Sequence, residues 1–197
     1  MKLSLSFNVM KIVFLLSFMG TSVAEARILL SKNCSKNVKG RISSFMNPLM
    51  GKLDDITQEK YSYEETINPF AGGVFVEEFQ IGLTTTELSN IRDVIYNKDV
   101  IMDCPGPKSP LCGIQKGGHA EINGRWYDRT PRVVLCNTDL ASFASKCDLA
   151  ETVFHEIAHL AGVEMSPYHS RPDHPQFSRD DKVYRFGKAV KSACQAL

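Results

Sequence analysis

The sequence carries almost no excess charge of either sign: 23 lysines and arginines stand against 22 aspartates and glutamates among 197 residues. Without a basic excess the chain has no field to hold a polyphosphate backbone, so nucleic acid is not an expected partner. Internal repeats and low-complexity tracts are also lacking, and 43% hydrophobic with 23% charged residues excludes disorder, collagen or a coiled coil for the whole chain. The composition is that of one globular domain.

The N-terminal segment lacks the apolar length that a membrane span requires. Its apolar run, Ile12–Phe18, follows Lys2 and Lys11 and precedes Ala24-Glu25-Ala26. A positive start, a short apolar run and small residues at a cleavage site are typical of a secretory signal. We expect a signal peptide over residues 1–26 and a single mature domain over residues 27–197. The product would be secreted or periplasmic, monomeric and without stable membrane insertion; the alternative is an uncleaved N-terminal anchor.

No pair of the six cysteines has the spacing of a Cys-x2-Cys zinc knuckle. All six follow residue 26, and an even number in an exported chain predicts three disulfides. Six cysteines allow fifteen pairings. We expect sequence neighbours to pair and the two mature ends to be tied together, which gives Cys104–Cys112, Cys136–Cys147 and Cys34–Cys194.

Four stretches with apolar residues at intervals of three and four predict amphipathic helices. They cover residues 34–56, with an interruption or kink near Pro48, and residues 86–98, 148–161 and 178–196. Thr84 to Thr86 offer N-cap hydroxyls for the second helix.

Strands are predicted between these helices. They cover residues 73–80, residues 119–127 with a hairpin turn at Asn123-Gly124, and residues 132–136, which could lie at a sheet edge. The expected fold class is therefore α+β, with a small β-sheet beside the helices.

The third predicted helix carries a His-Glu-x-x-His motif at His155, Glu156 and His159. Residues four apart share a helix face, so both imidazoles could bind one Zn²⁺ at about 2.0 Å, with Glu156 beside the open coordination position. Such an ion acidifies its bound water while the glutamate accepts the proton. Asp148 and Glu151 are the expected capping box of this helix, and Gly162 is its expected stop. The alternative is a helix whose two histidines bind no metal.

A catalytic zinc site usually has a third protein ligand. Metzincin spacing would require a histidine at position 165, which is Met165, so that family is excluded. The downstream candidates are Glu164, His169, Asp173, His174, Asp180 and Asp181.

The motif, followed by Asp180-Asp181-Lys182-Val183-Tyr184 and the late Cys194, resembles the aspzincins over residues 132–197. These are the deuterolysin-like and peptidyl-lysine metalloendopeptidases and their bacterial relatives. The resemblance implies a zincin-like α+β domain with an active-site helix, and a zinc endopeptidase activity. It also implies His155, His159 and Asp181 as zinc ligands, Glu156 as general base and Tyr184 as the phenol that supports the tetrahedral intermediate. The chain departs from the family in having Ser178-Arg179 where a Gly-Thr is usual, and a glycine only after Phe186.

The residues themselves leave other roles open. Ser178 and Asp181 also fit a capping box, Tyr184 could simply pack, and His169, His174 or Glu164 could be the third ligand. The expected substrate is a protein or peptide lying extended along the 132–136 strand. The alternative function is an exported, disulfide-stapled binding protein on the same scaffold with little or no catalysis; a weaker option is hydrolysis of a non-protein amide.

Overall fold

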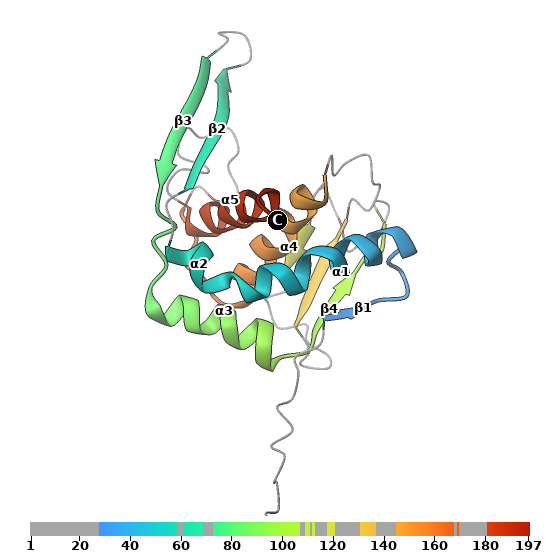
Figure 1. Ribbon diagram of the computed structural model, residues 1–197. Coiled ribbons are helices and arrows are strands. Elements are labelled where there is room, and N and C mark those ends of the chain that lie inside the picture. The colour runs from blue at the N-terminus through green and yellow to red at the C-terminus, as the bar shows by residue number, and fades with distance from the viewer. Residues whose placement is uncertain are drawn as a thin grey trace, which may run out of the picture.

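The computed structural model describes residues 28–58, 61–68, 73–106, 109–110, 112, 118–120, 131–136, 145–167, 169 and 181–197. The expected signal peptide, the Asn123-Gly124 turn, Ser178 and three candidate ligands (Asp173, His174 and Asp180) lie outside these residues. The described chain combines helices with a small sheet, which confirms the α+β class (Figure 1). Within the described ranges, no helix combines the length and apolarity that crossing a bilayer requires.

The main sheet has four short strands: β1 (Ile28–Leu30), β4 (Val100–Asp103), β6 (Arg132–Leu135) and β5 (Gly118–Ala120). Their order is β1-β4-β6-β5, with the first three parallel and β5 antiparallel to β6. The expectation that residues 132–136 form a sheet edge is therefore wrong, because β6 is paired on both sides. Val133, Val134 and Leu135 are fully buried, and such a continuous apolar run is typical of an interior strand. The strands that end this sheet order are β1 and β5.

The described residues form five helices: α1 (Lys36–Gly51), α2 (Leu53–Gln58), α3 (Thr85–Asn97), α4 (Lys146–Leu160) and α5 (Lys182–Gln195). All four helical predictions are confirmed to within a few residues. The first helix breaks at Lys52, with Pro48 kept inside α1. Phe45 and Leu49, which flank Pro48, are buried on the core face, and this burial holds the helix together through the proline.

A hairpin stands apart from the main sheet. Strands β2 (Tyr61–Asn68) and β3 (Gly73–Phe79) pair antiparallel as a separate two-stranded sheet. Figure 1 shows this hairpin projecting from the body of the molecule beside α5. The β3 strand was predicted, whereas β2 was not.

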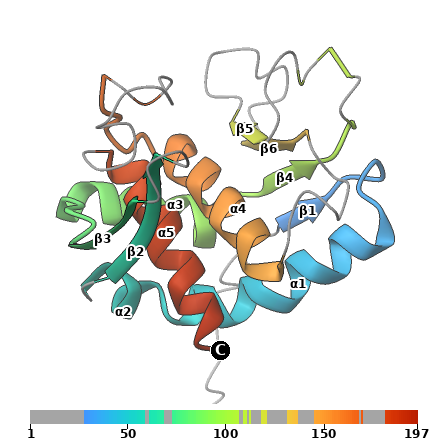
Figure 2. The same ribbon diagram turned by 90° about the horizontal axis from the view of Figure 1, so that it is seen from above.

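The centre of the molecule is α4, which lies between α5 on one side and the sheet on the other (Figure 2). Val153, Phe154, Ile157 and Ala158 of this helix are fully buried. Phe154 meets Phe186 of α5 edge to face, with ring centroids 6.2 Å apart. A helix this well packed is a rigid support for side chains that project from its remaining face.

Three disulfides form, as predicted, but the predicted pairing is wrong. The bonds are Cys34–Cys104, Cys112–Cys136 and Cys147–Cys194. The parallel pairing of β1 with β4 brings Cys34, just after β1, beside Cys104, just after β4. Cys147 lies in the first turn of α4 and Cys194 in the last turn of α5, and these two helices lie side by side. Tertiary pairing of elements, and not short sequence separation, decides which cysteines meet.

Candidate metal centre

The helix that carries the motif begins three residues earlier than its predicted cap. Ser145 is the N-cap, and its side chain exchanges hydrogen bonds with Asp148 in a capping box. The predicted box of Asp148 with Glu151 is therefore wrong. Glu151 faces α5 and forms ion pairs with Lys188 and Lys191. The helix is thus fixed at its start and along the side that faces α5.

The helix stops at Gly162, as predicted. Gly162 has a φ of +70°, a conformation that glycine adopts without strain. The N–H of Val163 returns to the carbonyl of Ala158, which closes the end of the helix. The chain then reverses toward the motif, and this turn brings the downstream loop back to the two histidines.

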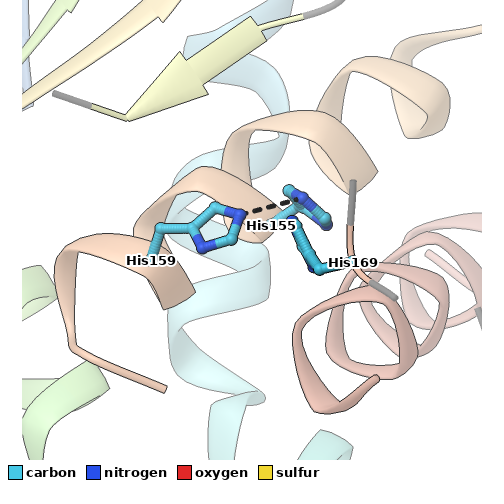
Figure 3. A group of neighbouring side chains, drawn as sticks. All are labelled: His155, His159 and His169. Atoms are coloured by element: carbon cyan, nitrogen blue, oxygen red, sulfur yellow. Dashed lines mark hydrogen bonds between the residues drawn. The ribbon is translucent and has the colours of Figure 1, made fainter. Parts of the chain in front are cut away.

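The two motif histidines face each other on α4. The Nε2 atoms of His155 and His159 are 3.2 Å apart. Figure 3 marks this contact with a dashed line. Two nitrogens that bind one tetrahedral Zn²⁺ at 2.0–2.1 Å lie about 3.3 Å apart. The spacing of the two rings therefore already matches that of a pair of zinc ligands.

A third imidazole, that of His169, lies against both rings. Its centroid is 5.2 Å from that of His155 and 4.6 Å from that of His159. One nitrogen from each of the three histidines falls within 4.8 Å of the others, so this cluster could hold a metal ion. Three imidazoles with one open position form a ligand set found in catalytic zinc sites.

Asp181 lies beside this cluster and is fully buried. Its Oδ2 accepts hydrogen bonds from the Nδ1 of His169 at 2.8 Å and from the backbone N–H of Ser166 at 2.9 Å. Its Oδ1 accepts from the backbone N–H groups of Val183 and Tyr184, which makes Asp181 the N-cap of α5. Burial alone would raise the pKa of Asp181, but these hydrogen bonds hold it below its ordinary value. Asp181 is therefore a carboxylate with four hydrogen bonds.

The contact with Asp181 fixes the tautomer of His169. A carboxylate accepts the proton on Nδ1, so that the neutral form of this ring carries its lone pair on Nε2. A ligand histidine whose other nitrogen donates to a carboxylate is the usual arrangement around protein-bound metals.

The other two rings are neutral. Burial, followed by the charges of neighbouring histidines, lowers the pKa of His155 to about 3 and that of His159 to about 4. Neutral imidazole is the form that binds a metal ion. The Nδ1 of His159 is buried and has no hydrogen-bond partner among the described residues.

The side chain of Tyr184, predicted to be catalytic, lies at this cluster. The ring of Tyr184 is 4.5 Å from that of His155 and 4.8 Å from that of His169, centroid to centroid. Burial, followed by the charges of Asp181 and of the buried Glu156, raises the pKa of the Tyr184 phenol to about 12. The phenol therefore stays protonated and able to donate.

The structure thus brings His155, His159 and Tyr184 into contact with one another or with His169, and it places Asp181 against His169, while Glu156 is buried on the same helix as the two motif histidines. It adds His169, which the sequence offered only as one of several alternative ligands. Glu164, another alternative, has an 81% exposed side chain. A Thr84-x-x-Glu87 pattern marks a further buried carboxylate that sequence reasoning did not single out, and the capping-box spacing alone could have found it.

No protein-family model matches the chain, and no curated protein matches it.

Proposed function

We propose that the protein is a secreted or periplasmic zinc endopeptidase of the zincin type, related to the aspzincins. The observation that carries this proposal is the meeting of three imidazoles. His155 and His159 lie on the helix that also holds Glu156, and their Nε2 atoms are 3.2 Å apart. The three disulfides are compatible with an oxidising compartment outside the cytosol.

The residues around the cluster fit a zinc ion. His155, His159 and His169 would hold it, and Asp181 would orient His169 from behind. When bound, the ion would lower the pKa of a water molecule and polarise the carbonyl group of a peptide. Asp181 as a direct third ligand, which the aspzincin resemblance implies, is the alternative arrangement. The carboxylate's four hydrogen bonds favour the supporting role.

The remaining chemistry would fall to two side chains. Glu156 follows the first histidine directly, and its carboxylate would accept the proton of the attacking water and return it to the leaving amine. The phenol of Tyr184 would donate a hydrogen bond to the oxygen on which negative charge develops. Its raised pKa keeps that proton in place across the physiological range.

Among the described strands, β5 offers an extended peptide a sheet edge on the side of the motif helix. Strand β5 ends the sheet order and packs against α4, the helix of the motif. A substrate added next to β5 would form backbone hydrogen bonds with it and pass the ends of the histidine side chains. This arrangement keeps the expected β-augmentation but places it on β5 and not on β6.

The proposal is tested by metal analysis of the purified, oxidised protein and by hydrolysis of a peptide library with and without a chelator. We expect about one zinc ion per chain and cleavage that the chelator stops. Glu156→Gln should keep the zinc and lose hydrolysis. Glu78→Gln, the same change at an exposed position of β3, is the matched control and should retain activity. A protein that binds zinc and peptide but turns nothing over would support the binding-protein alternative, and unchanged turnover in Glu156→Gln would reject the general-base role.

A further inference from the structure

A second buried carboxylate, Glu87, lies on the far side of the loop that carries His169. Glu87 is in the first turn of α3, and only 8% of its surface is exposed. Its Oε2 accepts hydrogen bonds from the N–H and the hydroxyl of Thr84 at 2.7 and 2.9 Å, which forms the capping box of α3. This much is ordinary helix capping.

The same carboxylate also binds two segments that are distant in sequence. Its Oε1 accepts a hydrogen bond from the backbone N–H of Glu164, just after the end of α4, at 3.1 Å. The Nζ of Lys182, the first residue of α5, lies 3.2 and 3.3 Å from its two oxygens. Glu87 is therefore bonded to the segment that leaves the motif helix and to the residue next to Asp181.

These bonds close a ring of contacts around the loop. Asp181 holds Ser166 and His169, Lys182 follows Asp181 in the chain, and Glu87 holds both Lys182 and Glu164. The loop from Glu164 to His169 is thus fixed at its start by Glu87 and at its far end by Asp181. A cap that served α3 alone would need only Thr84.

The carboxylate is ionised throughout the range in which an enzyme would work. Burial alone would raise the pKa of Glu87, but the hydrogen bonds from Thr84, Glu164 and Lys182 outweigh burial and lower it to about 2. A charged, buried group with this many donors is costly to leave unpaired, so each of its partners is held firmly.

We propose that Glu87 is a positioning residue for the metal centre: by joining the start of α5 to the end of α4, it sets where Asp181 presents His169 to His155 and His159. This inference rests on the proposed function. It means that α3, which carries none of the motif residues, helps to position the metal centre. Glu87 acts through Lys182 and Glu164, and it touches neither the ion nor the substrate.

The test compares Glu87→Ala with Thr84→Ala in the full, oxidised chain. Thr84→Ala removes the cap of α3 but leaves the bonds of Glu87 to Glu164 and Lys182, so it controls for simple loss of stability. We expect both variants to melt at a lower temperature. Glu87→Ala should weaken zinc binding about tenfold or more, measured by competition with a chromophoric chelator, whereas Thr84→Ala should stay within about twofold of the wild type.

A second measurement needs no metal. Long-range ¹H–¹⁵N NMR of the metal-free protein reports the tautomer of each histidine, and the wild-type His169 should carry its proton on Nδ1. Glu87→Ala should lose this single tautomer, and Glu87→Gln, which keeps an oxygen for the N–H of Glu164, should restore part of it. Should Glu87→Ala not fold, Glu87→Gln is compared with Thr84→Ala in its place.

The outcomes separate the two proposals. A wild-type protein that takes up no zinc rejects the proposed function, while the tautomer measurement still decides the role of Glu87. A wild-type protein that binds zinc, with Glu87 and Thr84 variants equal in zinc affinity or in His169 tautomer, overturns the positioning role alone.

Discussion

The Oδ2 atom of Asp181 accepts the Nδ1 proton of His169 at 2.8 Å, and the same carboxylate caps α5 through its other oxygen. One buried side chain therefore sets both the start of a helix and the direction of an imidazole. The two functions are separable by mutation, because asparagine caps a helix about as well as aspartate does.

We predict that Asp181→Asn retains α5 but weakens zinc binding by roughly 10- to 100-fold, the usual cost of losing a group that orients a ligand. The amide can keep one oxygen on the N–H groups of Val183 and Tyr184, but its nitrogen cannot accept from His169. His169→Ala should cost more affinity than Asp181→Asn, and chelator competition measures both. If Asp181→Asn instead weakens zinc binding more than His169→Ala does, and as much as His155→Ala, Asp181 is the direct ligand.

We predict that Tyr184→Phe lowers kcat about 10²-fold or more, with little change in KM or in zinc content. The expected cause is loss of one hydrogen-bond donor to the developing oxyanion. Burial, followed by the negative charges of Asp181, Glu156 and Glu151, raises the pKa of the phenol to about 12, so the wild-type donor is present at all working pH values. Steady-state kinetics on a cleaved peptide would measure the effect.

Tyr96→Phe is the matched control for that variant. Tyr96 lies on α3, is partly exposed, and donates to the carbonyl of Met50. Tyr96→Phe removes the same phenol oxygen, but from a residue outside the histidine cluster, so kcat should not change. An equal loss of activity in the two variants would contradict the role of Tyr184.

We predict that Gly187→Ala harms activity more than stability. A Cβ at this position would lie 3.2 Å from the carbonyl oxygen of Glu151 and 3.4 Å from the Cβ of His155. Alanine gains about 1 kcal/mol of helix propensity but adds a methyl group to a tight contact between α5 and α4, at a cost of about 1–3 kcal/mol. The free energy of unfolding should therefore fall by less than about 2 kcal/mol. Displacement of α5 should lower kcat/KM about tenfold, because this helix carries Tyr184 and is capped by Asp181.

Gly40→Ala, in the interior of α1, is the control for Gly187→Ala. A Cβ there would meet open space, so this variant should gain about 0.5–1 kcal/mol and keep full activity. Urea unfolding and peptide hydrolysis give the two readouts. Full activity in Gly187→Ala would show that the close approach of the two helices is not needed at the site.

The sequence predicted helices better than strands, and the reason is physical. The apolar stripes of α1, α3, α4 and α5 are long and regular, whereas β1 and β5 have three residues each, too few for a periodic pattern to emerge. The place of β6 in the middle of the sheet depends on parallel pairing with β4, which is a tertiary contact. Cys34 and Cys104 meet for the same reason, at a separation of 70 residues.

We predict an acid-dependent stability that Glu87→Gln removes. The folded pKa of Glu87 is lowered from 4.5 to about 2, so its stabilising effect is fully present above pH 4.5 and is lost as the pH falls toward 2. From that shift in pKa, Glu87→Gln should lower the free energy of unfolding by about 2–3 kcal/mol at pH 7. Near pH 2 it should lower it little.

Urea unfolding of the oxidised protein at several pH values would measure this difference. Glu164→Gln removes the same charge from an 81% exposed side chain that lies 3.7 Å from Lys182, and should change stability by less than about 1 kcal/mol. A cost of Glu87→Gln that does not vary between pH 7 and pH 2 would contradict the linkage.

The part of the candidate site that lies on α4 was predictable from the sequence, whereas the part supplied by the loop after Gly162 and by the start of α5 was not. His155, Glu156 and His159 follow from spacing alone, because one helical turn places both rings on one face. His169 and Asp181 come from two segments whose meeting depends on the turn at Gly162 and on the cap of α5. Sequence reasoning weighed Asp181 either as a zinc ligand or as a capping-box residue after Ser178, whereas in the structure Asp181 is itself the N-cap of α5 and its carboxylate contacts His169.

The three disulfides pair the six cysteines consecutively along the chain: the first with the second, the third with the fourth and the fifth with the sixth. A chain that enters an oxidising compartment N-terminus first can therefore complete each bond before the next cysteine arrives. Oxidation in order of emergence yields the native set directly, without the slow exchange that interleaved bonds would need from an isomerase.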